Sequence, residues 1–316
     1  MSNNGDIAGI SAGAAGPGKP VPAASRPNRI GAALASFGSA GILGVAPFLI
    51  FAIIFLIFPT LGLIGGAFVD KAGKLTLQNF IDLTQPTIVD AYIISIKVSA
   101  ASAVLGALVG LILALAVGRG GLPSWIRSTV MTFSGVASNF AGIPLAFAFL
   151  ATLGRLGLVT ILLRTVFDFD IYRAGFNILS FSGLTITYLY FQIPLMVLII
   201  MPAIDGLRNE WREAAETLGA GSWHYWRHIG LPVLWPSILG TLALLFANSF
   251  GAIATAYGLT GSSLNIVPIL LYAQIRGDVL HNPNLGAALA LGMIVITGLA
   301  NVLYLVLRAR AERWMR

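Results

Sequence analysis

Residues 89–117 read VDAYIISIKVSAASAVLGALVGLILALAV, and this stretch decides the solvent in which the chain folds. Only Asp90 and Lys97 carry charge within it, and Asp90 lies at its start. About 20 apolar helical residues cross the ~30 Å of hydrocarbon in a bilayer. A helix also satisfies its own backbone hydrogen bonds, as lipid requires. The stretch therefore predicts a transmembrane helix.

Further apolar segments of similar length lie on both sides of this one along the chain. The sequence predicts an all-α integral membrane protein with six transmembrane helices, at about 41–69, 89–117, 128–153, 179–204, 230–257 and 285–307. A shorter apolar segment, 156–169, contains Arg164, and we expect it to be an interfacial or re-entrant piece. Two glycine pairs at four-residue spacing, Gly62/Gly66 and Gly106/Gly110, would let neighbouring helices approach closely.

The amino-acid composition also indicates that the chain folds in a lipid bilayer. The chain is 57% hydrophobic and 10% charged, with a mean hydropathy of +0.87, whereas soluble domains carry about 25% charged residues. It has no cysteine, which excludes disulfides, iron–sulfur sites and thiol nucleophiles. The net charge of +7 is typical of basic residues at the cytoplasmic ends of membrane helices, so we expect a lipid bilayer and no nucleic acid as partner.

The distribution of basic residues predicts the orientation. Of the 19 Lys and Arg residues, 12 fall in the two terminal tails and in the connections after the second and fourth spans. Because basic connections stay in the cytoplasm, both termini are predicted to be cytoplasmic.

The N-terminal residues differ in composition from the rest of the chain. Residues 1–35 are rich in Gly, Ala, Ser, Pro and Asn, which predicts a disordered cytoplasmic tail. The apolar segment that begins near Gly41 is too long for a signal peptide, so we expect it to remain as an anchor. Residues 36–316 then form the transmembrane domain.

Two motifs that suggest chemistry fail on inspection. Gly13-x4-Gly18-Lys19 is followed by Pro20, where a phosphate-binding loop needs Ser or Thr, so we expect no ATP hydrolysis by this chain. His224 and His228 have a metal-ligand spacing but no carboxylate partner beside them. The sequence therefore predicts neither an enzyme nor a metal site.

The connection between the fourth and fifth spans, residues 205–229, is long and charged. Helix-forming residues run from Glu210 to Leu218, and Gly219 is suited to end a helix. Ser222 is suited to cap a second short helix that leads toward the membrane. A simple connection needs only a few polar residues, so this helix–turn–helix pattern predicts a docking surface.

Seven positions in this connection carry a family resemblance. The residues are Glu213, Ala214, Ala215, Gly219, Ile229, Leu231 and Pro232. Their types and spacing resemble the EAA motif of ABC-importer permeases, the inner-membrane components of binding-protein-dependent transport systems. With the six spans, the resemblance covers roughly residues 40–310.

The resemblance implies a type I ABC importer permease in a bacterial inner membrane. Residues 205–229 would then form a coupling loop that docks on a separate ATPase. Expected partners are two ATPase subunits, a second permease subunit (identical or related) and an extracytoplasmic solute-binding protein. ATP and magnesium would bind to the ATPase, and no cofactor to this chain.

Polar residues inside the spans are candidates for the solute path. These are Asn139, Tyr188, Tyr190, Gln192 and Asn248, although ordinary helix–helix hydrogen bonding would also explain them. The segments 45–48 and 135–150 resemble spermidine/putrescine permeases, which implies a polyamine or similar small solute. Iron, thiamine and phosphonate permeases are the alternatives.

A secondary transporter or channel is the alternative from another class. It predicts carboxylates within the membrane or an inverted repeat. The Asp and Glu residues instead fall in connections or near span ends, and no repeat is evident. The importer interpretation is therefore favoured.

Overall fold

The structure is a computed structural model that describes residues 39–276 and 281–314. The chain divides into two compact units, Met1–Phe58 and Pro59–Arg316. The described residues are helical apart from connections and one isolated antiparallel bridge between Val69 and Leu75. The predicted tail, residues 1–35, lies outside the described residues.

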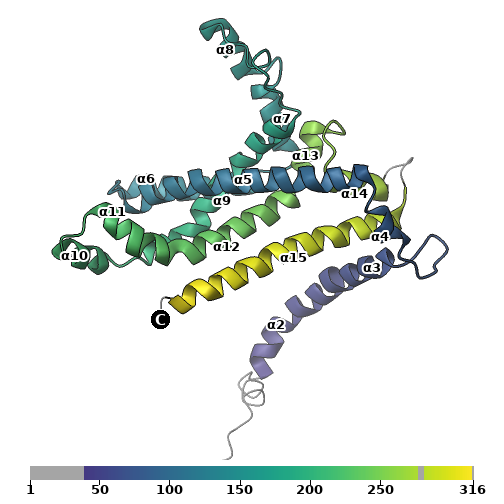
Figure 1. The fold of residues 1–316 in the computed structure, drawn as a ribbon, viewed down its shortest axis with the longest axis horizontal. Coiled ribbons are helices and arrows are strands. Elements are labelled where there is room, and N and C mark those ends of the chain that lie inside the picture. The colour runs from purple at the N-terminus through teal and green to yellow at the C-terminus, as the bar shows by residue number, and fades with distance from the viewer. Residues whose placement is uncertain (1–38, 277–280, 315–316) are drawn as a thin grey trace, which may run out of the picture. The chain divides into compact units, whose positions relative to one another are not determined.

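The helices follow one another with short connections (Figure 1). In the first unit they are α2 (Ser39–Ala52) and the π-helical η1 (Ile53–Ile57), and α3 (Phe58–Ala67) continues from η1 across the boundary between the units. The second unit continues with α4 (Gln78–Asp82), α5 (Pro86–Arg119), α6 (Ser124–Asn139), α7 (Ile143–Leu153), α8 (Leu158–Phe167), α9 (Phe181–Asp205), α10 (Asn209–Thr217), α11 (Ser222–Tyr225), η2 (π-helical, Trp226–Gly230), α12 (Leu231–Phe250), α13 (Ile253–Thr260), α14 (Val267–Arg276) and α15 (Pro283–Trp314).

Six helical stretches among the described residues are long and apolar enough to cross a membrane, as predicted. They are Gly44–Ala67, Pro86–Arg119, Ile143–Phe167, Phe181–Asp205, Ser222–Phe250 and Pro283–Val306. Four of these agree with the predicted spans to within a few residues. The third and fifth do not.

The third span was predicted wrongly at 128–153. The backbone breaks between α6 and α7, where Gly142 has φ +80° and Pro144 cannot donate a backbone hydrogen bond. The apolar stretch long enough to span runs through α7 and α8, and the predicted interfacial segment is α8. Hydropathy alone did not reveal this break, because a hydropathy average over neighbouring residues does not report the backbone conformation at Gly142.

The fifth span, predicted at 230–257, is also broken. Helix α12 ends at Phe250 and α13 starts at Ile253, with Gly251 and Ala252 between them. A helix interrupted at membrane depth leaves backbone groups that must find other partners. One such partner is the Tyr188 hydroxyl, which donates to the carbonyl oxygen of Ala252.

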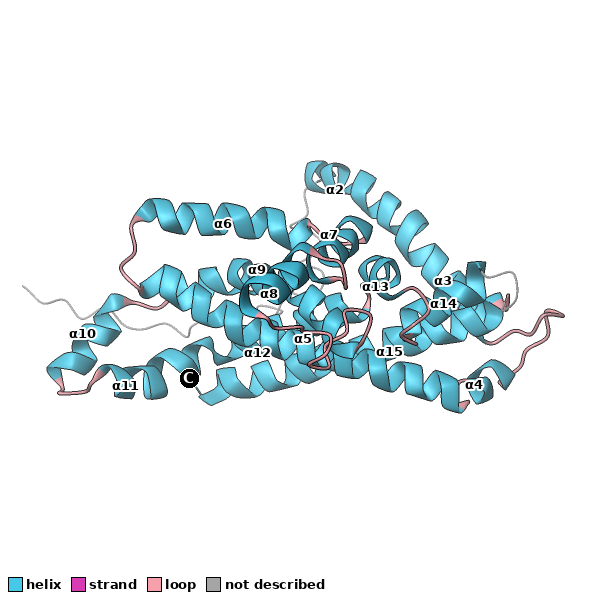
Figure 2. Ribbon diagram, turned by 90° about the horizontal axis from the view of Figure 1, so that it is seen from above, coloured by secondary structure: helices cyan, strands magenta, loops and turns pink. Residues whose placement is uncertain are grey.

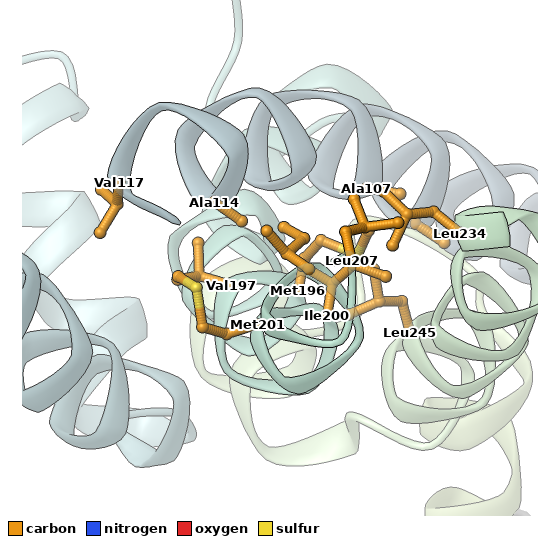
Figure 3. Close-up of a cluster of buried hydrophobic side chains, with 12 residues drawn as sticks. Ala107, Ala114, Val117, Met196, Val197, Ile200, Met201, Leu207, Leu234 and Leu245 are labelled. Carbon is orange, nitrogen blue, oxygen red and sulfur yellow. The ribbon is translucent and has the colours of Figure 1, made fainter. Parts of the chain in front are cut away.

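The core of the second unit forms where α5, α9 and α12 pack together (Figure 3). A Cβ atom at Gly106 would lie 2.7 Å from Cβ of Gln192, and one at Gly110 would lie 2.6 Å from Cβ of Met196. This pair therefore sits at a close helix contact, as predicted. In the other pair, Gly66 would meet Ala287 at 3.5 Å, whereas a Cβ at Gly62 would meet nothing within 4 Å, so that half of the prediction is wrong.

The connection after α8 is held by Asp170. Its carboxylate accepts backbone N–H bonds from Tyr172 (2.9 Å) and Arg173 (3.3 Å), and Arg164 lies 3.0 Å away. Burial raises the pKa of Asp170. The two backbone hydrogen bonds and the positive charges of Arg164 and Arg173 lower it more, so the pKa lies below its ordinary value. In Figure 1, α8 lies away from α5, α9 and α12, and in Figure 2, which is seen from above, it therefore overlaps them in projection.

Candidate functional site

The predicted helix–turn–helix is present in the connection between α9 and α12. Helix α10 ends in a turn around Gly219, which has φ +78°. The amide of Ala220 donates to the carbonyl of Ala215 (2.9 Å), and that of Gly219 donates to Glu216 (3.0 Å). This pair of bonds is a Schellman motif, which requires a left-handed residue where glycine is favoured. The predicted turn at Gly219 is confirmed.

The second helix starts differently from the prediction. Gly221 occupies the N-cap position, and Ser222 is the first helical residue without a capping bond, so its predicted capping role is wrong. Helix α11 then passes through η2 into α12. Leu231 and Pro232 are the first two residues of α12, which continues directly from η2.

The two short helices enclose an apolar groove of about 470 Å³. Its lining is Trp211, Ala214, Ala215, Leu218, Ala220, His224, Tyr225, His228, Ile229 and Val233. Ala214, Ala215 and Ile229 are residues of the predicted motif, and the two alanines are small enough to leave the groove open. Glu213 is exposed.

The rim of this groove carries large apolar side chains that the chain itself leaves uncovered. Leu218 is 88% exposed, and Trp223, on the neighbouring helix α11, is 73% exposed. Large exposed apolar side chains beside a groove commonly mark a site of contact with another protein. The groove and these side chains together form the candidate docking surface.

The histidine pair has a structural arrangement of its own. The rings of His224 and His228 stack with centroids 4.8 Å apart, and Nδ1 of His228 lies 3.0 Å from the carbonyl oxygen of His224. Among the described residues, no three His, Cys, Asp or Glu side chains gather to hold a metal ion.

Three features near the loop were missed in the sequence. A Cβ at Gly230 would lie 2.5 Å from the ring of Trp226, so the chain needs glycine where it enters α12. Arg119 and Arg127 reach the junction between α9 and α10. In the sequence both arginines indicated only a cytoplasmic membrane end, since their partners lie far along the chain.

The candidate path residues divide into two groups. Tyr188 and Gln192 are buried and bind α12 and the break after it: the Tyr188 hydroxyl donates to Ala252 (2.9 Å), and Nε2 of Gln192 donates to Leu245 (2.9 Å). Asn139 and Asn248 are exposed near the ends of α6 and α12. Tyr190 is partly buried against the ring of Phe149. A role in the solute path stays a prediction for all five residues.

The two helix breaks lie side by side. The amide of Gly142, at the first break, donates to Oγ1 of Thr255 (2.7 Å), just after the second. Gly258 permits this contact, because a Cβ there would lie 3.1 Å from Cβ of Ala146. In membrane proteins, broken backbone is tolerated where it is buried in protein or lines a water-filled cavity. The paired breaks are therefore the strongest candidate for a path-lining element.

Comparison with known proteins shows similarity over most of the chain. Residues 106–316 match the family model described as binding-protein-dependent transport system inner membrane component. The molybdenum transport system permease protein of Mycobacterium tuberculosis (strain H37Rv) is 29% identical over 223 residues, which cover 69% of this chain and 78% of that protein. The sulfate transport system permease protein of Escherichia coli (strain K12) is 26% identical over 200 residues, which cover 61% and 68%.

One solved structure shares the fold over nearly its whole length. It is a chain of a bacterial ABC transporter involved in the import of the acidic polysaccharide alginate. The TM-score is 0.69 at 18% identity, and the match covers 90% of this chain and 99% of that chain. At this identity the likeness concerns the fold alone.

Proposed function

The chain belongs to the binding-protein-dependent transport system inner membrane components, the permease subunits of ABC importers, and on this premise we propose how its cytoplasmic loop works. The match confirms the family that the motif predicted, and the likeness to the alginate importer confirms the all-α importer permease fold. The chain is a multi-pass inner-membrane subunit without catalytic activity, and a separate ATPase hydrolyses ATP.

We propose that residues 205–229 dock on that ATPase and pass its movement to the spans. The observation that carries this proposal is the apolar groove between α10 and α11, with its uncovered rim. Ala214, Ala215 and Ile229 would contact the partner, while Glu213 offers it a carboxylate. Gly219 sets the angle between the two helices.

The partners follow from the same family membership. One chain has six candidate spans and one docking loop, so we propose that a second permease subunit completes the path and that each loop meets one ATPase subunit. ATP and magnesium would bind to the ATPases, and an extracytoplasmic binding protein would deliver the solute. The basic loop and both termini would face the cytoplasm.

For the solute we propose a small oxyanion of the sulfate or molybdate class. The relatives named for molybdenum and sulfate support it. The positions of α7 and α13 also support an anion. Both helices begin at the paired breaks, and helix N-termini favour negative charge. Polyamine transport, expected from the sequence, has no support among these relatives and is the alternative, with iron, thiamine and phosphonate.

The docking proposal is tested by co-purification. We expect the ATPase to co-purify with the wild-type chain, co-expressed with its partner subunits. Glu213→Lys reverses the charge on the docking face, and Gly219→Pro disrupts the turn, so either should abolish uptake while the chain still inserts. Asp168→Lys, outside the loop, makes the same charge change and should leave uptake intact. Normal uptake by both loop variants would refute the coupling role.

A further inference from the structure

The junction between α9 and α10 is a potential hinge. Helix α9 ends at Asp205, and α10 starts at Asn209, so only residues 206–208 separate a core helix from the docking helix. If this junction bent freely, movement of α10 would be lost before it reached the spans. The contacts across the junction therefore decide how well the loop can transmit force.

Arg119, the last residue of α5, bridges this junction. Its Nη2 donates to the carbonyl of Ile204 (3.0 Å) and also contacts the carbonyl of Leu207, while Nη1 donates to Oδ1 of Asn209 (2.6 Å). One guanidinium thus holds the end of α9, the junction and the first residue of α10. Arginine suits this task because its planar fork offers several donors in fixed directions.

The carbonyl groups that Arg119 contacts belong to residues of the hydrophobic core. Ile204 is 0% and Leu207 3% exposed, and both pack in the cluster formed by α5, α9 and α12 (Figure 3 labels Leu207). Asn209, in contrast, is exposed. The bond between Arg119 and Asn209 therefore ties the first residue of the docking helix to a closely packed body.

A second arginine holds the same junction from α6. Nη2 of Arg127 lies 2.6 Å from Oδ2 of Asp205, with both side chains about half exposed. Exposed ion pairs contribute little on their own. This contact nevertheless connects α6, which leads to the first helix break, with the end of α9.

We propose that Arg119 is a positioning residue that, through Asn209, makes the docking helix move as one body with α5 and α9. The inference rests on the proposed function of the loop. Its alternative is that Arg119 only satisfies the last carbonyls of α9, where a cation is favourable. The Asn209 contact separates the two, because it contributes nothing to the α9 carbonyls.

The test measures solute imported per ATP hydrolysed, in proteoliposomes that contain the whole transporter with its binding protein. Asn209→Leu removes the acceptor and leaves the α9 carbonyls bonded to Arg119. We expect the ratio to fall about two- to fivefold, the range that loss of one exposed charged contact gives in a two-state equilibrium. Asn209→Asp keeps an acceptor for the guanidinium and should restore the ratio to near the wild-type value.

Arg119→Lys supplies the second comparison. Lysine keeps the charge, but its single ammonium cannot reproduce the forked contacts, so the ratio should again fall while the ATPase still co-purifies. Arg173→Lys, in the connection after α8 where the Arg173 side chain is 90% exposed, makes the same exchange and should leave the ratio unchanged.

The possible results distinguish a failure of this inference from a failure of the docking proposal. A wild-type ratio in Asn209→Leu overturns the inference, whatever Arg119→Lys does. An equal loss in Asn209→Leu and Asn209→Asp also overturns it, because the acceptor would then be irrelevant. Failure of the wild-type chain to bind the ATPase would instead refute the docking proposal on which the inference rests.

Discussion

At the scale of single residues, close packing decides which side chains the core tolerates. Gly110 has Met196 Cβ at 2.6 Å and the carbonyl oxygen of Ile193 at 2.8 Å from where its own Cβ would be. In lipid the association of helices depends on such close contacts, because burial of apolar surface adds little there. Gly62 has the same motif spacing but no such neighbour.

We therefore expect Gly110→Ala to destabilise the chain and Gly62→Ala to leave it unchanged or slightly more stable. The added methyl must push α9 from α5, and overpacking of this kind costs about 1–3 kcal/mol. Thermal unfolding in detergent, followed by loss of helical circular dichroism, measures the difference. Equal melting temperatures for the two variants would contradict the packing role.

The residue types alone did not show which polar side chains line a solute path and which only bond between helices. Tyr188 and Gln192 have polar groups that suggest a solute path, yet both are buried and bond to α12 or to the break after it. Asn139 and Asn248 have the same chemical appearance in the sequence but are exposed. The difference arises from which face of each helix meets a neighbour, and apolar sequence on all sides of a membrane helix conceals that face.

At the scale of elements, the docking loop could be predicted because its signals are local. The charged helix α10 and the turn at Gly219 each depend on residues within a few positions. The helix breaks depend on distant partners instead. Gly142 bonds to Thr255, and neither sequence neighbourhood alone indicates the pairing.

A matched pair of glycines tests the turn. Gly219 has φ +78° and Gly221 has φ −71°, and at both positions an added Cβ would meet no atom within 4 Å, so only the backbone conformation differs. We expect Gly219→Ala to weaken the end of α10 by about 1–2 kcal/mol, the cost of the left-handed region for an L-residue, and Gly221→Ala to have no such effect.

Hydrogen exchange at the amide of Ala220, which bonds to Ala215, reports this change directly. A loss of 1–2 kcal/mol corresponds to roughly 5- to 30-fold faster exchange. Unchanged protection in Gly219→Ala would show that the turn does not depend on the glycine.

At the scale of the whole molecule, the chain is one part of a transporter. Its helices provide candidate spans and one docking loop, and the solute is proposed to arrive from a binding protein. We propose that selectivity is divided between this binding protein and the path. The proposal of an oxyanion therefore concerns the assembly and is tested on it.

We expect sulfate or molybdate to drive uptake by the reconstituted transporter with its binding protein, and spermidine to leave uptake at background. The reason is that helix N-termini at the paired breaks favour an anion over a cation. Radiolabelled sulfate, with unlabelled molybdate and spermidine as competitors, measures this. Competition by spermidine alone would favour the polyamine alternative.

The sequence by itself determined that the chain is a membrane protein, how many candidate spans it has, where its helix–turn–helix connection lies and to which family it belongs. These conclusions depend on composition, on long apolar segments and on a motif within one connection. Only the tertiary structure decided where the third and fifth helices break, which polar side chains are buried and how Arg119 holds Asn209, 90 residues away. Hydropathy reports whether each residue prefers lipid or water. Helix breaks, and long-range contacts such as that between Arg119 and Asn209, depend instead on which helices pack together.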